Sequence, residues 1–347
     1  MKNLTTIGID LAKNYIQIHG ANEQGKPVFK KRVARDKFLE TMANLPRCLV
    51  GMEACGGSNY WAKELLQLGH DAKLMSPKKV KKYTDHNKND ARDAQACSEA
   101  VGRGNMQFVP IKTEEQMNMQ SLHRIRSFYV KQCTALMNMI RGLLLEYGIA
   151  IAQGKAALMK KLKILEEEFL QDEMKKEFSR LKEDLVFLNE KINYYTDQVK
   201  KVAKTNKICK QIQTIEGIGP ITSTALVAKI GNGSGFKKGR ELSAYLGLVP
   251  KQASSGDKQV LLGITKHGDR YVRQLLVHGG RSVINSVMRK NKSTNTFIKN
   301  DKHSQWIRKL TERVGMNKAT VAIANKNARL VIGLLKNQND FDAELAH

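Results

Sequence analysis

Hydrophobic and polar positions near the start of the chain form short runs that predict strands separated by helices. Two of these runs are apolar and end in an acid, and another alternates with the period of two that is typical of a strand. Strands interleaved with helices indicate an α/β layer with partly parallel pairing. The predicted strands are Thr5–Asp10, Tyr15–Ala21, Val28–Val33, Cys48–Glu53 and Asp71–Met75, and the predicted helices are Lys37–Ala43 and Tyr60–Leu68.

From about Leu122 the pattern changes to long helices, and one of them carries a heptad seam. Its apolar positions are separated alternately by three and four residues, which is the signature of a coiled coil. A long helix packed into one globular core is the alternative interpretation. The seam consists of Phe178, Leu181, Leu185, Leu188, Ile192, Tyr195, Val199 and Val202.

The last part of the chain begins again with glycine-punctuated segments and ends in a basic, helical region. We therefore expect an α/β plus α protein of three parts. These are an α/β domain over 1–122, a helical coiled-coil arm over 123–207, and a mostly helical domain over 208–347.

Charge is the first indication of function. The chain has 59 Lys and Arg against 33 Asp and Glu, a formal net charge of +26. An excess of this size repels itself unless a polyanion neutralises it, which favours nucleic acid as the partner, with an anionic membrane as the second polyanion. No run approaches the ~18 uncharged apolar residues of a membrane span, and no signal peptide is recognisable. Five cysteines without a CxxC pair favour a reduced, cytoplasmic compartment.

Four acids are candidates for a metal site. Asp10 and Glu53 end predicted strands, where open α/β sheets place their sites. Asp90 and Asp93 are three residues apart, so both lie on one face of the helix that they begin. Carboxylates suit hard divalent cations, and two such ions clamp the attacking and leaving oxygens of a phosphodiester. Taken singly, each acid has a plainer interpretation as a helix-terminus or turn residue.

Three segments that contain these acids resemble one known family. GIDLAK, GMEACGGS and NKNDARDAQA look like the three blocks of the DEDD transposases of bacterial insertion sequences. That family includes the Piv-type DNA invertases and the bridge-RNA-guided recombinases. Its N-terminal domain is similar to the RuvC junction resolvase, a ribonuclease-H-like fold. The resemblance implies that Asp10, Glu53, Asp90 and Asp93 are catalytic and bind magnesium (Mg2+).

The C-terminal part resembles the second domain of the same family. The matching segments are IEGIGPITSTALVAKIG, YLGLVPKQASSG and ITKHGDRYVRQLL. In that family the domain supplies a serine nucleophile from a Pro-x-x-x-x-Ser-Gly segment. Pro250, Ser255 and Gly256 stand at those positions, so the resemblance implies Ser255, with Ser254 as its immediate neighbour. A serine is a poor nucleophile unless a base or metal activates it.

Basic residues flank both sets of motifs, and we expect some of them to contact phosphate. Lys78, Lys79, Lys81 and Lys82 precede the Asp90 helix, and Arg270, Arg273 and Arg281 follow the serine segment.

The resemblance implies a DNA transposase or recombinase that cuts and rejoins DNA through a serine-linked intermediate with metal assistance. Its expected partners are donor and target DNA, a structured noncoding guide RNA and further copies of the chain, as a dimer or tetramer. We expect no membrane partner and a cytoplasmic, nucleoid-associated location in a bacterium. One alternative is a RuvC-like junction-resolving endonuclease that uses water as the nucleophile. The other is a non-catalytic nucleic-acid-binding scaffold.

Overall fold

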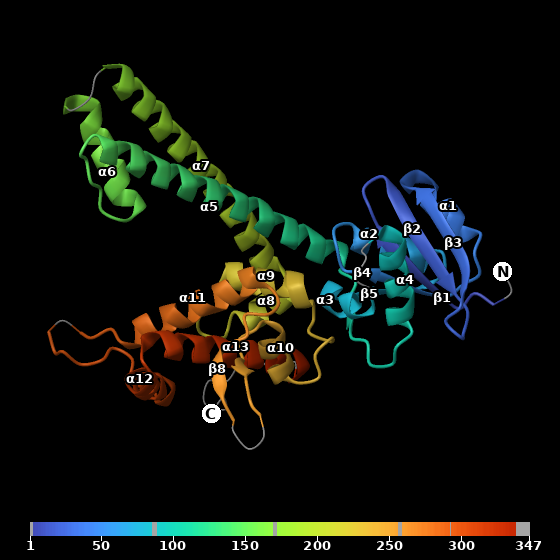
Figure 1. Cartoon of the computed structure of the whole chain (residues 1–347). Coiled ribbons are helices and arrows are strands. Elements are labelled where there is room, and N and C mark those ends of the chain that lie inside the picture. Colours follow the sequence, from blue (N-terminus) through green and yellow to red (C-terminus); the bar gives the residue numbers. More distant parts are fainter. Residues whose placement is uncertain (1–2, 85–88, 169–171, 256–258, 292, 338–347) are drawn as a thin grey trace. The chain divides into compact units, whose positions relative to one another are not determined.

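The computed structural model describes residues 3–84, 89–168, 172–255, 259–291 and 293–337 (Figure 1). The chain divides into two compact units, Met1–Thr113 and Glu114–His347. The first is a mixed α/β unit, and the second contains the long helices of the predicted arm together with the helical C-terminal part.

The first unit is built on a six-stranded sheet with the order β3-β2-β1-β4-β5-β6. β1 and β4, and β4 and β5, pair in parallel, whereas β2, β3 and β6 join antiparallel. All five predicted strands are confirmed to within a residue at their ends, and β6 was not predicted. This mixed sheet is consistent with the ribonuclease-H-like domain that the resemblance implies. The strands are β1 (Thr6–Leu11), β2 (Tyr15–Ala21), β3 (Pro27–Ala34), β4 (Leu49–Glu53), β5 (Asp71–Met75) and β6 (Phe108–Val109).

Helices cover both faces of this sheet. On one face, α1 (Phe38–Ala43) and α2 (Ser58–Gln67) pack on a core formed by the odd-numbered residues of β1 and by β4. Phe38 and Trp61 meet edge to face, with their ring centroids 5.1 Å apart. On the other face lies α4 (Asp90–Val101). In the chain it follows α3 (Pro77–Val80) and the 3-10 turn η2 (Lys81–Tyr83), and a second 3-10 turn, η1 (Arg35–Lys37), precedes α1.

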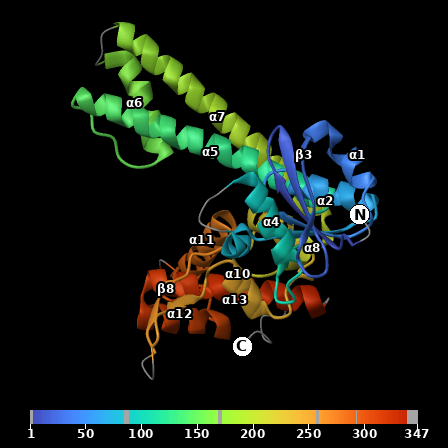
Figure 2. The same ribbon diagram turned by 45° about the vertical axis from the view of Figure 1, so that its right-hand side comes forward.

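In the second unit, α5 (Glu114–Glu146) and α7 (Asp172–Thr205) lie side by side along much of their length, and α6 (Lys155–Glu168) joins them (Figures 1 and 2). The heptad seam of α7 faces these helices of its own chain. Phe178 and Leu185 are fully buried, and they pack with residues of α5 and α6 such as Ile140 and Leu158. Leu181, Leu188 and Ile192 are half-buried against the same cluster, so this part of the seam packs within a helical hairpin of a single chain.

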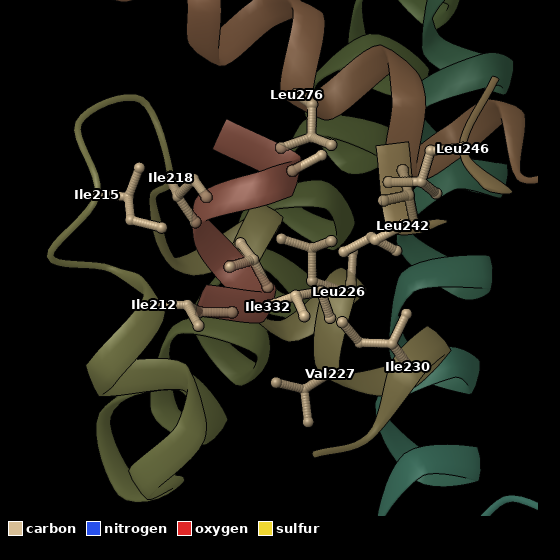
Figure 3. Packing of buried hydrophobic residues seen from close by; sticks show 14 of the residues in the cluster. Ile212, Ile215, Ile218, Leu226, Val227, Ile230, Leu242, Leu246, Leu276 and Ile332 are labelled. Atoms are coloured by element: carbon tan, nitrogen blue, oxygen red, sulfur yellow. The ribbon is translucent and has the colours of Figure 1, made fainter. Parts of the chain in front are cut away.

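The rest of the second unit is a helical core with one small hairpin. Its main cluster of buried side chains includes Leu226, Leu242, Leu276 and Ile332, which come from four different helices (Figure 3). The elements are α8 (Lys207–Ile212), α9 (Pro220–Ile230), α10 (Gly239–Tyr245), β7 (Pro250–Gln252), β8 (Leu261–Ile264), α11 (Arg270–Val287), α12 (Lys302–Val314) and α13 (Met316–Asn337).

A buried histidine ties the start of α5 to this core. His123 Nε2 lies 2.9 Å from Thr224 Oγ1, and its Nδ1 lies 3.0 Å from the Tyr271 hydroxyl. Because Thr224 donates its own proton to the Pro220 carbonyl, the Nε2–H of His123 donates to Thr224 and Nδ1 accepts from Tyr271. Burial lowers the pKa of His123 to about 4, so the ring is neutral at neutral pH.

Among the described residues, no helix combines the length and the apolar character needed to cross a bilayer.

Candidate active site

Asp10 and Glu53 occupy equivalent places on neighbouring parallel strands. Ile9 of β1 is in register with Met52 of β4, so the next residue on each strand is an acid at the same carboxyl-terminal edge. Side chains alternate between the two faces of a strand, which places Asp10 with Gly8 and Glu53 with Gly51. Both acids are half-buried, and both take part in further interactions within the fold.

The face that carries Asp10 and Glu53 is the one on which α4 packs. A Cβ atom at Gly8 would lie 1.9 Å from the Ala94 carbonyl oxygen, and Thr6 Oγ1 lies 3.3 Å from Ser98 Oγ. The helix therefore runs opposite to β1, from Ala94 beside Gly8 to Ser98 beside Thr6. Its first turn consequently extends toward Asp10.

That first turn contributes the other two acids. Asp90 is the first residue of α4 and is exposed, whereas Asp93, one turn before the buried Cys97, is half-buried. The helix cap itself is Asn89, whose Oδ1 accepts a hydrogen bond of 2.8 Å from the Arg92 backbone N–H. Asp90 is therefore not the cap, and its first-turn position is also the one that the plainer interpretation as a helix-terminus residue requires.

Two cysteine thiols near the acids have raised pKa values. Burial raises the pKa of Cys97, and the negative charges of Glu53, Asp10 and, to a smaller extent, Asp93 raise it further. The pKa of Cys55 is also raised, by burial first and then by Glu53 and Asp10. Three of the four predicted acids thus act on one buried thiol, which remains protonated and is a poor metal ligand.

The donor set fits a hard divalent cation. Carboxylate oxygens at strand ends and on the first turn of a helix are the ligands that magnesium accepts, together with water. Within the described residues, no three Asp, Glu, His or Cys side chains are drawn together closely enough to hold one ion as they stand. The described carboxylates therefore do not form a ready-made metal cage.

Ser255 lies in the second unit, on the hairpin formed by β7 and β8. Ala253 pairs with Val260 through a backbone hydrogen bond of 2.9 Å, and Ser254 Oγ accepts the Val260 N–H at 3.3 Å. Ser254 and Ser255 lie beyond the end of β7, and both residues are exposed. Gly256 of the predicted motif lies outside the described residues.

One of the basic residues that follow the serine segment has a structural role. Arg273 is only 9% exposed, and its guanidinium donates to the carbonyls of Leu246 at 3.0 Å and His267 at 2.6 Å. These hydrogen bonds hold the segment between α10 and α11 in place. The sequence patterns above did not single out Lys30, Lys31 and Arg32 on β3. Three consecutive basic residues on a predicted strand are a pattern that could have indicated them.

Comparison with known proteins identifies the class of protein to which this architecture belongs. A DEDD transposase family of the IS110 type matches residues 7–149, which include all four acids. The family described as Transposase IS116/IS110/IS902 matches residues 209–296, which include the serine hairpin. The chain belongs to this family of insertion-sequence transposases, as the resemblance implied.

Whole-length relatives support the same assignment. The chain is 42% identical over 344 residues to the transposase for insertion sequence element IS1111A of Coxiella burnetii, covering 98% of this chain and 92% of that protein. It is 40% identical to a probable family 20 transposase of Pseudomonas aeruginosa, covering 97% and 98%. It is 34% identical to the transposase for insertion sequence element IS1328 of Yersinia enterocolitica, covering 95% and 96%. Membership of a transposase family implies an enzyme that binds and cuts DNA.

Proposed function

We propose that this transposase cuts and rejoins DNA through a covalent bond between Ser255 and the DNA backbone. The observation that supports this most directly is the pairing of two features. Asp10 and Glu53 end two neighbouring parallel strands at one edge of the sheet, and an exposed serine lies on a hairpin of the second unit.

In this proposal Asp10, Glu53, Asp90 and Asp93 hold magnesium. The position of Asp10 and Glu53 at one end of paired parallel strands, and of Asp90 and Asp93 in the first turn of α4, supports that assignment. Magnesium bound there would ease deprotonation of the serine and stabilise the negative charge on the departing oxygen. Carboxylates that lie close together repel each other, and a bound divalent cation relieves that repulsion.

Ser255 would supply the nucleophile. Its Oγ loses a proton and attacks the phosphorus of one phosphodiester, and the bond to the 3′ oxygen breaks. The 3′ oxygen leaves and takes up a proton, and the strand remains linked to the serine as a phosphodiester. Attack by a 3′-hydroxyl of another strand reverses these steps and restores the serine, so no energy-supplying cofactor is consumed. Both serines are exposed, but Ser254 Oγ accepts a hydrogen bond from the Val260 N–H, which supports Ser255 as the nucleophile.

The acids and the serine belong to different compact units. We propose that the reaction requires a homo-oligomer, a dimer or tetramer, in which one copy's serine serves another copy's acids. We also propose that a structured noncoding RNA pairs with donor and target DNA and selects the sequences that recombine. The net charge of +26 supports binding of more nucleic acid than one short DNA segment.

The covalent step has a direct test. The protein is incubated with end-labelled donor DNA and magnesium, and products are separated under denaturing conditions. A protein-linked band that protease removes is expected for the unaltered protein. Ser255→Ala should abolish the band and all recombinant product, whereas Ser254→Ala, the matched control one residue away, should only reduce them.

Recombinant product from the Ser255→Ala protein would contradict the covalent mechanism and favour direct attack by a 3′-hydroxyl. Cleavage without joining, equally strong in both variants, would favour hydrolysis by water.

A further inference from the structure

A pocket of about 390 Å³ opens on the α4 side of the sheet, beside the candidate active site. Gln17 and His19 of β2 and Lys30 and Arg32 of β3 form its walls and floor, and the first turns of α4, including Arg92, complete it. All of these residues belong to the first compact unit.

The pocket begins one strand away from Asp10. In the β1–β2 register Asp10 faces Gln17, and in the β2–β3 register Gln17 faces Arg32. Directly opposed residues on antiparallel strands have Cα atoms about 5 Å apart, so the row from the acid to Arg32 crosses only two such steps. The first turn of α4 also spans both regions, since Asp93 belongs to the acid set and Arg92 lines the pocket.

The lining is strongly basic. Lys30, Lys31 and Arg32 come from the edge strand, and Arg92 comes from the helix. The Arg32 guanidinium stacks over the Tyr15 ring at 4.1 Å, which restricts its orientation. Carboxylates also lie nearby: Glu99 accepts a hydrogen bond of 3.0 Å from Gln95 at the side of the pocket, Asp10 is in register with Gln17, and Asp93 is next to Arg92 in the chain.

His19 lines the pocket and has an unused hydrogen-bonding capacity. The residue is only 5% exposed, and within the described part of the chain neither ring nitrogen has a hydrogen-bond partner. Buried polar groups are nearly always satisfied, so an unpaired imidazole beside a basic pocket points to a missing partner. Burial and the charge of Lys30 lower the pKa of His19, so the neutral ring keeps one N–H donor.

We propose that this pocket binds a backbone phosphate of the DNA strand that the neighbouring acids cut. The proposal rests on the DNA-cleaving function proposed above and adds a site for the strand next to the reacting phosphodiester. Lysines on an edge strand also serve to prevent sheet-to-sheet pairing, and that role alone would require neither the basic helix residue nor the unpaired histidine.

The test measures binding of a short labelled DNA duplex to the full chain at several salt concentrations, with a chelator present. Lys30→Gln with Arg32→Gln should weaken binding several-fold and reduce the slope of log affinity against log salt by about 1, for the one phosphate that the pocket binds. The matched control, Lys26→Gln with Lys37→Gln, removes the same charge from the β2–β3 turn and from η1, and should leave the slope unchanged. Equal effects of the two pairs would overturn the proposal, because they would reflect overall charge alone.

His19→Phe separates ligand binding from packing. Phenylalanine fills similar space without an unpaired polar group, so the melting temperature should stay the same or rise while DNA binding weakens. Unchanged binding by His19→Phe would remove the histidine from the site. Losses confined to an RNA duplex of the same sequence would overturn the assignment to DNA. Because no cleavage is involved, a negative result here leaves the Ser255 test intact, and a failed Ser255 test leaves this one intact.

Discussion

At the scale of single residues, the acids of the first unit are distinguished by their shared surroundings. Asp10 and Glu53 stand one residue beyond a paired Ile9 and Met52, on the face toward the helix that carries Asp93. Their negative charges raise the pKa of the buried Cys97 together with burial itself. Mutual repulsion among such carboxylates is relieved by a cation or by a proton, and at neutral pH a divalent cation is the more effective partner.

The first prediction concerns these acids. Asp10→Asn, Glu53→Gln, Asp90→Asn and Asp93→Asn keep the side-chain shape but remove the charge. Each should lower magnesium-dependent cleavage roughly 10²-fold or more, the scale of losing one electrostatic stabiliser of the transition state. In the presence of a chelator the free energy of unfolding should be unchanged or slightly higher, because repulsion is removed. Cleavage assays across magnesium concentrations and thermal unfolding measure the two effects.

Asp36→Asn is the matched control, since Asp36 is an exposed acid of the same unit within η1. It should leave both quantities unchanged. Full activity of any acid variant at limiting magnesium would remove that residue from the metal site.

At the scale of elements, the position of α4 depends on glycines in the strands beneath it. A Cβ atom at Gly8 would lie 1.9 Å from the Ala94 carbonyl oxygen, and one at Gly51 would lie 2.9 Å from that of Cys97. Backbone atoms of a helix cannot move aside as a flexible side chain can. Any larger residue at Gly8 must therefore displace α4, and with it the acids of its first turn.

The second prediction follows from this contact. Gly8→Ala should destabilise the first unit by roughly 1–3 kcal/mol, the usual cost of overpacking, and should reduce cleavage by shifting Asp93 relative to Asp10. Gly56→Ala is the control, because nothing lies within 4 Å of a Cβ at Gly56 in the loop after β4. Thermal unfolding and a cleavage assay on both variants measure the outcome. A stable, fully active Gly8→Ala protein would show that α4 tolerates displacement and that its position is not needed for the reaction.

The arm illustrates a second point at this scale. Heptad residues of α7 pack against α5 and α6 of the same chain, and Phe178 and Leu185 are buried there. A partner helix from another copy is therefore not required to cover the seam. The homo-oligomer proposed above would use other surfaces of the molecule.

At the scale of the whole molecule, charge is the dominant physical property. The net charge of +26 is distributed over both units, since basic residues line the pocket of the first and flank the serine hairpin of the second. A polyanion that spans both would relieve repulsion in each. This fits a transposase, which must hold donor and target DNA during strand exchange.

The third prediction is a steep salt dependence of nucleic-acid binding. Each neutralised phosphate contributes roughly 0.9 to the slope of log affinity against log salt on duplex DNA. An enzyme that engages several phosphates should therefore lose about a thousandfold or more in affinity between low and moderately high salt. Titration of a labelled duplex at a series of salt concentrations measures the slope. A nearly flat slope would contradict the electrostatic basis for nucleic-acid binding.

The sequence by itself determined the local features. These features are the five strands, the long seam-bearing helix and the acids at two strand ends. Each depends on residues a few positions apart, because a hydrophobic period of two, or of three and four, directly reflects burial. The net charge follows from composition alone. The motif blocks also indicated the family, because they keep their order along the chain.

Only the tertiary structure decided which distant residues meet. Parallel pairing of β1 with β4 brings Asp10 and Glu53 to one face of the sheet, although 42 residues lie between them in the sequence. Arg273 is buried and donates hydrogen bonds to backbone carbonyls of its own unit. The basic run that begins at Lys30 lies beside Gln17 only because β2 pairs with β3. The physical reason is that strand order, register and helix packing arise from contacts between segments far apart in the sequence, which no local pattern of hydrophobic and polar residues specifies.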